Sequence, residues 1–197
     1  MSVSAPPKLM TTEELLAMPD DGMERWLIKG ELREKYPDVD NGVPLTVRNR
    51  FHTETTALTS YHLNAWKMQQ PKPRGKVHDG EVGVRLPQQP DVTVGIDVIY
   101  VDAATAARQS DESTVIVGVP TVAIEVLSPN DTTEDIKEKV DVLREAGVPH
   151  IWIANPYDQT VTVYRPGVRP QMFNADQEIV AEPHLPGFRV LVANLFE

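Results

Sequence analysis

The sequence predicts one domain of mixed α/β (α+β) class, in which helices flank a central β-sheet. Polar and apolar residues alternate over 81–86, and residues 121–127 are almost wholly apolar, which is typical of strands. Apolar side chains recur at helical spacing over 50–68 and 131–146. The chain has 197 residues, 41% hydrophobic and 24% charged, which suits one soluble domain with a sizeable core.

Local signals place each expected element. Thr11 and Glu14 cap a short helix, the helix over 131–146 begins at Asp131 or Thr132, and Gly147 ends it. The other expected elements are a strand with a turn at Lys29-Gly30 over 26–32, a loop over 37–44, a helix over 50–68, strands over 81–86 and 91–101, a short helix or polar excursion over 103–112, an apolar segment over 115–119, strands over 121–127, 150–154 and 160–164, and an apolar tail over 187–196 that docks on the core.

The composition excludes several classes of protein. The chain has no cysteine, which excludes disulfides, thiolate zinc sites, iron–sulfur clusters and a cysteine nucleophile. It also fits a reducing cytoplasm. No run of 18 apolar residues predicts a membrane span, and residues 1–9 lack the apolar core of a signal peptide. We therefore expect a cytoplasmic protein that does not enter a membrane.

The net charge of −10 argues at face value against a nucleic-acid partner. The excess is local, however, because residues 1–85 are balanced and residues 86–197 carry all of it. Residues 48–85 hold seven basic and three acidic side chains. This basic stretch is either an ordinary solvated surface or a face for a polyanion.

Three charged residues stand where apolar ones are expected. Glu125 is the polar residue on one face of its strand, so it lies at the sheet rim or serves chemistry. Asp91 opens a strand, where an aspartate is also common in turns. Lys139 lies within or beside the apolar stripe of its helix, where it extends to solvent or pairs with a buried carboxylate. Asp135, one turn earlier, is a possible partner for Lys139.

Together these residues suggest a site for phosphate chemistry. Two carboxylates can hold a hard divalent cation such as Mg²⁺ through oxygen ligands. Such a cation polarises a phosphate and lowers the pKa of a bound water. A lysine beside it can orient that water or neutralise charge that develops on the phosphate oxygens.

The ordered series of these residues resembles a known family. Pro90-Asp91 and, after 33 residues, Glu125-Val126-Leu127-Ser128-Pro129 are similar to the PD-(D/E)XK nuclease superfamily, and more narrowly to the Uma-type family of bacterial restriction endonucleases. The likeness covers almost the whole chain. Its other parts are Met10–Leu15, Leu27–Leu32, His52 at a helix start, Asp135, Lys139, Gly147–Ile153, Leu185–Phe188 and Leu195-Phe196.

The resemblance implies a restriction-endonuclease-like fold, a mixed central sheet flanked by helices, and it implies roles for individual residues. Asp91 and Glu125 would be catalytic metal ligands for Mg²⁺, or Mn²⁺, with the backbone carbonyl of Val126 as a third. Position 127, usually lysine in the superfamily, is Leu127, so Lys139 would be the catalytic lysine. The auxiliary residues would be His52, Glu54 and Asp135.

The implied function is metal-dependent hydrolysis of DNA phosphodiester bonds by a homodimer, with the basic stretch 48–85 as a candidate DNA contact face. The single domain 1–197 would comprise a helix-and-hairpin extension (1–46), a catalytic core (47–165) and a C-terminal docking segment (166–197). DNA binding without metal should then be weak and sensitive to salt.

Two alternatives stay open. A nuclease-fold binding or regulatory module with little or no catalytic activity would keep the fold but lack metal affinity at the site. A metal hydrolase acting on a small acidic substrate is the other. The five histidines form no His-x-x-x-His pair, and the chain lacks a Gly-x-x-x-x-Gly-Lys loop and a Gly-x-Ser-x-Gly elbow.

Overall fold

The computed structural model describes residues 9–35, 39–40, 43–44, 49–129 and 131–197. In chain order its elements are α1 (Thr12–Leu16), β1 (Glu24–Ile28), β2 (Glu31–Lys35), β3 (Val39–Asp40), β4 (Val43–Pro44), α2 (Arg50–Gln69), β5 (Lys76–Leu86), β6 (Val92–Val101), α3 (Ala103–Ala107), β7 (Ile116–Val117), β8 (Val122–Val126), α4 (Thr133–Glu145), β9 (His150–Asn155), β10 (Thr160–Tyr164), β11 (Gln171–Phe173), β12 (Glu178–Val180), β13 (Arg189–Leu191) and the 3₁₀ turn η1 (Val192–Leu195).

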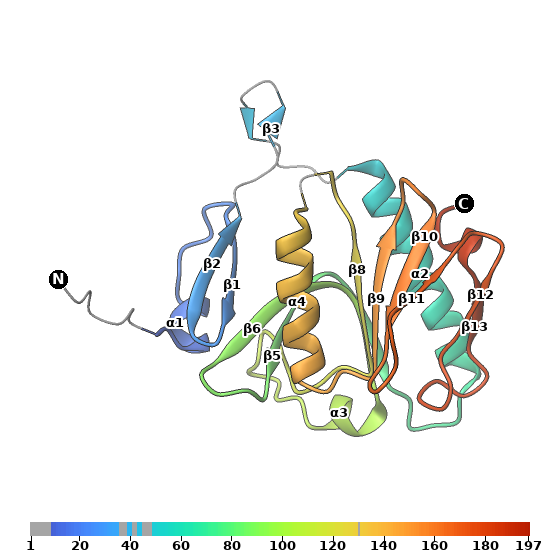
Figure 1. The fold of residues 1–197 in the computed structure, drawn as a ribbon. Helices are drawn as coiled ribbons and strands as arrows, with labels where there is room; N and C mark the ends of the chain where they lie inside the picture. Colours follow the sequence, from blue (N-terminus) through green and yellow to red (C-terminus); the bar gives the residue numbers. More distant parts are fainter. Residues whose placement is uncertain (1–8, 36–38, 41–42, 45–48, 130) are drawn as a thin grey trace.

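A nine-stranded mixed sheet forms the centre of the molecule (Figure 1). Its strands run in the order β11-β10-β9-β8-β6-β1-β2, and β5 pairs with β6 and with β7. Strands β8 and β9 are parallel because α4 connects them, whereas β6 is antiparallel to β5, β8 and β1. The predicted fold class, a mixed sheet flanked by helices, is therefore confirmed.

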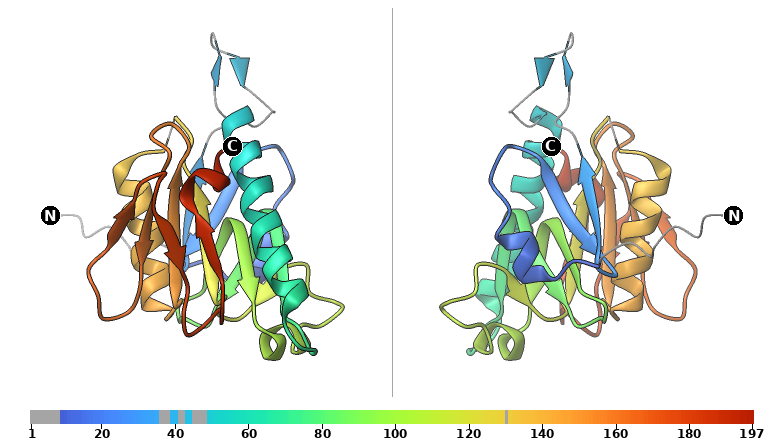
Figure 2. Two further views of the ribbon diagram at one scale, coloured as in Figure 1. Left: turned by 90° about the vertical axis from the view of Figure 1, so that its right-hand side faces the viewer. Right: turned by 90° about the vertical axis from the view of Figure 1, so that its left-hand side faces the viewer.

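The two long helices cover opposite faces of this sheet (Figure 2). Leu63 and Trp66 of α2 pack with Val98 and Val122 on one face. Val140 and Leu143 of α4 pack with strand residues on the other face. The C-terminal segment lies on the α2 side, where the Trp66 indole donates a 2.9 Å hydrogen bond to the carbonyl of Pro186. The apolar tail thus docks on the core as its composition predicts.

The sheet splits beside the middle of β6. Strand β1 pairs with β6 only at Thr93, whereas β8 pairs with β6 from Val98 onward. Side-chain contacts bridge the split instead: Lys35 of β2 reaches Asp131 at 2.6 Å, and Arg33 of β2 reaches Glu138 of α4 at 2.8 Å. A pocket therefore lies between the β1–β2 hairpin, α4 and the part of the β6 edge that neither β1 nor β8 pairs with.

Strand β5, which pairs with the other edge of β6, contains a β-bulge. Asp79 pairs with Val98 and Val82 pairs with Ile96, so two residues of β5 face Asp97 alone. The bulge explains why alternation predicts a strand only from residue 81, whereas β5 begins at Lys76.

The remaining predicted elements match the structure closely. The capping box of Thr11 and Glu14 forms, and Thr132 is the N-cap of α4. The short strands β11, β12 and β13 were not predicted, because three-residue strands leave too little periodicity to detect. Within the expected loop 37–44, only 39–40 and 43–44 are described, and they form a two-stranded ladder. Among the described residues, no helix combines the length and apolar character needed to cross a bilayer.

Candidate functional site

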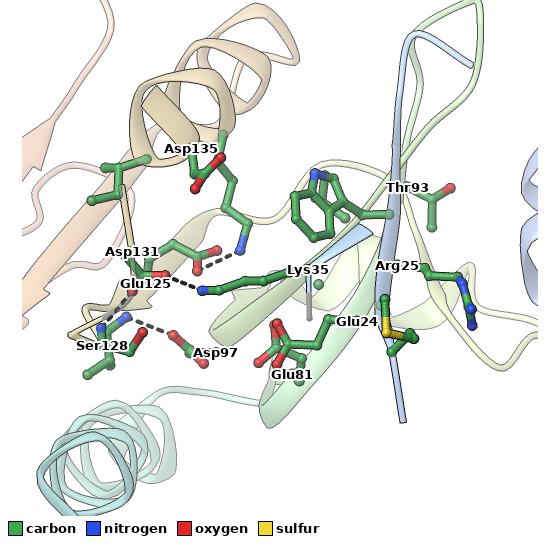
Figure 3. Close-up of a pocket in the computed structure, with 18 of the residues that line it drawn as sticks. Glu24, Arg25, Lys35, Glu81, Thr93, Asp97, Glu125, Ser128, Asp131 and Asp135 are labelled. Atoms are coloured by element: carbon green, nitrogen blue, oxygen red, sulfur yellow. Dashed lines mark hydrogen bonds and ion pairs between the residues drawn. The ribbon is translucent and has the colours of Figure 1, made fainter. Parts of the chain in front are cut away.

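The pocket in the sheet split has a volume of about 380 Å³, within the range typical of small-ligand and active sites. Residues from nearly every element around the split line it (Figure 3). Its polar lining includes Glu24, Arg25, Lys35, His52, Glu81, Thr93, Asp97, Glu125, Ser128, Asp131, Asp135 and Lys139.

Two carboxylates of the pocket face each other across neighbouring strands. Ile99 of β6 pairs with Ala123 of β8 in antiparallel register. Because the strands are antiparallel, Asp97, two residues before Ile99, lies opposite Glu125, two residues after Ala123. Side chains two residues apart on a strand point to the same face, so Asp97 and Glu125 share the face of Ile99 and Ala123. That face is covered by α4, because Ala123 and Ile99 belong to the same core cluster as Val140.

Asp97 is buried and fully engaged by its neighbours. Its Oδ2 accepts a 2.7 Å hydrogen bond from the backbone N–H of Val126, and its Oδ1 lies 3.0 Å from Nε2 of His52. Burial alone would raise the pKa of Asp97, but the hydrogen bond and charge of His52, the Val126 N–H and the Lys139 charge lower it below its ordinary value. Asp97 is thus held as a carboxylate in a fixed orientation.

Glu125 pairs with the lysine predicted to point inward. Lys139 Nζ lies 2.8 Å from Glu125 Oε2, and only 13% of the Glu125 side chain and 22% of the Lys139 side chain are exposed. Burial raises the pKa of Glu125 to about 8, Lys139 opposes this shift, and the charges of Asp97 and Glu81 add to it. The pKa of Lys139 is raised, since the negative charges of Glu125 and Glu81 outweigh its burial.

The second oxygen of Glu125 has a different environment. Glu125 Oε1 is buried in the pocket wall and has no hydrogen-bond partner. A buried carboxylate oxygen without a donor is costly, and a cation bound in the pocket would satisfy it. The donor set of this corner, two carboxylates on adjacent strands, fits a hard divalent cation.

A complete ligand shell is not preformed. Over the ranges that the structure describes, no three His, Asp or Glu side chains are gathered closely enough to hold a metal ion by themselves. Mg²⁺ commonly binds through one or two carboxylates and takes its other ligands from water and substrate phosphate. The pocket therefore fits a cation that is coordinated partly by water, by a carbonyl or by substrate.

The structure does not bring Asp91 into this pocket. Its Oδ2 accepts hydrogen bonds from the backbone N–H and the hydroxyl of Thr12, both at 2.9 Å, and from Arg85 at 2.9 Å. The Thr12 N–H bond is the main reason that the pKa of Asp91 is lowered, with further contributions from the Thr12 hydroxyl and Arg85. Along an extended strand, six residues separate it from Asp97 by roughly 20 Å. Asp91 thus ties α1 to β6.

Of the three predicted auxiliary residues, two line the pocket and one does not. His52, 7% exposed near the start of α2, lines the pocket and contacts Asp97. Asp135 lines the rim and accepts a 2.7 Å hydrogen bond from Thr132, so the partner of Lys139 is Glu125 and not Asp135. Glu54 is exposed on α2 and is not among the pocket residues.

Two pocket carboxylates were missed in the sequence. Asp97 interrupts the apolar strand Val92–Val101 just as Glu125 interrupts its own, so the rule that selected Glu125 also selects Asp97. Asp91, which follows Pro90, matches the family motif more closely than Asp97 does. Glu81 carried a weaker signal, a glycine directly before it inside a strand, which is typical of a bulge.

This pocket and the mixed sheet around it define a protein of the restriction-endonuclease-like class. A family model described as "Putative restriction endonuclease" (Uma2) matches residues 13–193, and the chain belongs to this family. The predicted family membership is confirmed.

Comparison with solved structures agrees with this fold. The structure is similar, with a TM-score of 0.75, to that of a protein described as a putative nuclease of DUF820 from Anabaena variabilis ATCC 29413. The two chains are 18% identical, and the match covers 95% of this chain and 97% of that one. No curated protein matches the chain significantly.

Proposed function

We propose that the protein is a metal-dependent DNA endonuclease whose cation site is formed by Asp97 and Glu125, with Lys139 beside it. The observation that carries the proposal is the placement of these two carboxylates opposite each other on β6 and β8, with the lysine 2.8 Å from one of them. In this proposal Asp97 takes the role that the sequence pattern gave to Asp91.

Each group has a defined part. A bound Mg²⁺ or Mn²⁺ would polarise the phosphodiester and make a nearby water more acidic. The carboxylates of Asp97 and Glu125 would hold that cation, and the backbone carbonyl of the pocket residue Val126 is proposed as a further ligand. The Lys139 ammonium would orient the attacking water or offset negative charge on the phosphate. His52 positions Asp97 through its 3.0 Å contact.

The proposed substrate is DNA, and the basic stretch 48–85 is its candidate contact face. This stretch includes all of α2 and all of β5 except Leu86. One member, Arg85, is already engaged by Glu13 and Asp91, which favours the lysines and arginines of α2 and the loop after it as contacts. A homodimer and a cytoplasmic location are also proposed, on the family resemblance. Sedimentation velocity tests the first.

The experiment is cleavage of supercoiled plasmid DNA with Mg²⁺ or Mn²⁺ by the parent protein, Asp97→Asn and Glu125→Gln. The control is Asp141→Asn, which makes the same charge change on the exposed part of α4. We expect both pocket variants to lose at least 100-fold in cleavage rate while the control cleaves like the parent. Cleavage by both pocket variants at the parent rate would refute the site.

The same experiment distinguishes the nuclease from a nuclease-fold binding module without catalytic activity. If the purified parent binds no Mg²⁺ or Mn²⁺ and cleaves no DNA, but retains DNA in a gel-shift assay, the nuclease-fold binding module is favoured instead.

A further inference from the structure

We propose that Glu81 is a third acidic residue of this cation site, which holds the bound cation through the cation's water molecules. The inference rests on the proposed function, because it requires that Asp97 and Glu125 bind a divalent cation.

The position of Glu81 is set by the bulge in β5. Gly80 and Glu81 together oppose the single residue Asp97, and Glu81 lines the same pocket. Strand β6 thus presents Asp97 between Glu125 on one side and Glu81 on the other. Figure 3 shows the Glu81 side chain on the same side of Lys35 as Asp97, among the residues that line the pocket.

The backbone at Glu81 is unusual. Its φ is +64°, in the left-handed region that glycine adopts without cost and that glutamate adopts rarely. A glycine at this position would relieve the strain and preserve the bulge. Strained residues of this kind persist at sites where their side chain has a function. At Glu81 this unusual backbone coincides with a carboxylate that lines the pocket, which supports a role for that carboxylate.

The neighbouring strand leaves room for this carboxylate. Gly95 lies two residues from Asp97 on β6, and a Cβ added there would lie 3.0 Å from Glu81 Oε1. The missing side chain at position 95 thus allows the Glu81 carboxyl to lie over β6. From there its charge acts on both Glu125 and Lys139.

The role through water follows from two observations. Among the described residues, no three acidic or histidine side chains are close enough to bind one ion directly. Mg²⁺ keeps several of its water molecules in proteins, and a nearby carboxylate can accept hydrogen bonds from them. Losing such an outer group typically lowers metal affinity by about 10–100-fold.

The test measures Mn²⁺ and Mg²⁺ binding by isothermal titration calorimetry in the intact chain without DNA, together with thermal unfolding of the metal-free protein. The variants are Glu81→Gln, which keeps the shape, and Glu81→Gly, which removes the strain. Gln159→Gly is the matched control, because Gln159 also has a positive φ (50°) but lies in the β9–β10 turn.

We expect both Glu81 variants to bind the cations about 10–100-fold more weakly than the parent. Metal-free Glu81→Gly should melt at or above the parent temperature, because glycine adopts this φ without strain. Gln159→Gly should keep the parent affinity.

Binding by Glu81→Gln and Glu81→Gly within threefold of the parent would overturn the inference, and so would weaker binding accompanied by a lower melting temperature in both. Asp97→Asn and Glu125→Gln separate the two levels of the proposal. If these two also bind like the parent, the cation site itself fails. If they lose binding and the Glu81 variants do not, only the role of Glu81 fails.

Discussion

Lys139 Nζ lies 2.8 Å from Glu125 Oε2, although one residue is on α4 and the other on β8. The pair joins the helix to the strand at the floor of the pocket. Glu125 Oε1 stays buried without a hydrogen-bond donor, so the lysine satisfies only one of the two carboxylate oxygens.

Removing the lysine should lower the stability of the folded protein. Lys139→Met leaves the Glu125 carboxylate buried without its cationic partner, so we expect a loss of about 1–3 kcal/mol in the free energy of unfolding. Glu125→Gln combined with Lys139→Met should recover part of that loss. Urea denaturation of the two single variants and the double variant measures the coupling, and simple additivity would show that the pair is not coupled.

Asp91 should matter for folding rather than for cleavage. Asp91→Asn weakens the hydrogen bonds from Thr12 and Arg85, and we expect it to lower the free energy of unfolding by about 1–3 kcal/mol. Plasmid cleavage at a temperature well below the melting point should remain near the parent rate. A loss of cleavage as large as that of Asp97→Asn, without loss of stability, would return the metal-ligand role to Asp91.

The buried histidine His150 should make the protein acid-sensitive. It is 1% exposed, and burial, together with the charges of His184 and Arg165, lowers its pKa from 6.5 to about 4. The unfolded chain therefore takes up a proton at this residue at a higher pH than the folded protein does. The contribution of neutral His150 to the free energy of unfolding is fully present above pH 6.5. It is lost as the pH drops toward 4, by at most about 3 kcal/mol.

Thermal unfolding between pH 7.5 and 4 measures this loss. In His150→Gln, which cannot take up a proton, the slope between pH 6.5 and 4 should become shallower. An unchanged slope in this variant would assign the acid sensitivity to other groups.

The C-terminal segment should contribute strongly to stability. Phe188 is 2% exposed and packs edge-on against Trp66 at 6.1 Å between ring centroids. We expect Phe188→Ala to cost about 3–5 kcal/mol because it opens a cavity beneath α2. Replacing the exposed Tyr61 of α2 with alanine is the control and should change stability little. A similar effect for both changes would contradict docking of the tail.

Much of the fold could be predicted from the sequence because it depends on local patterns. The caps at Thr11 and Thr132 and the apolar stripe of α4 are local signals, and the structure contains them where expected. The inward position of Lys139 follows from the same stripe. Periodicity gave no signal for the three-residue strands near the C-terminus, because so few residues leave too little alternation to detect.

The candidate site was predicted only in part. Glu125 and Lys139 could be found because each breaks the pattern of its own element. Asp97 breaks the pattern of its strand in the same way, but Pro90 made Asp91 the closer match to the expected motif.

The sequence by itself determined the fold class, the family and the points at which Glu125 and Lys139 break an apolar pattern, because hydrophobic periodicity and ordered motifs are properties of the chain. Only the tertiary structure decided which aspartate faces Glu125. That choice depends on where β8 joins β6 in register, at Val98 and beyond, and on the bulge that brings Glu81 to the same place. Register and bulges arise from pairing between distant segments, and one strand's pattern does not contain them.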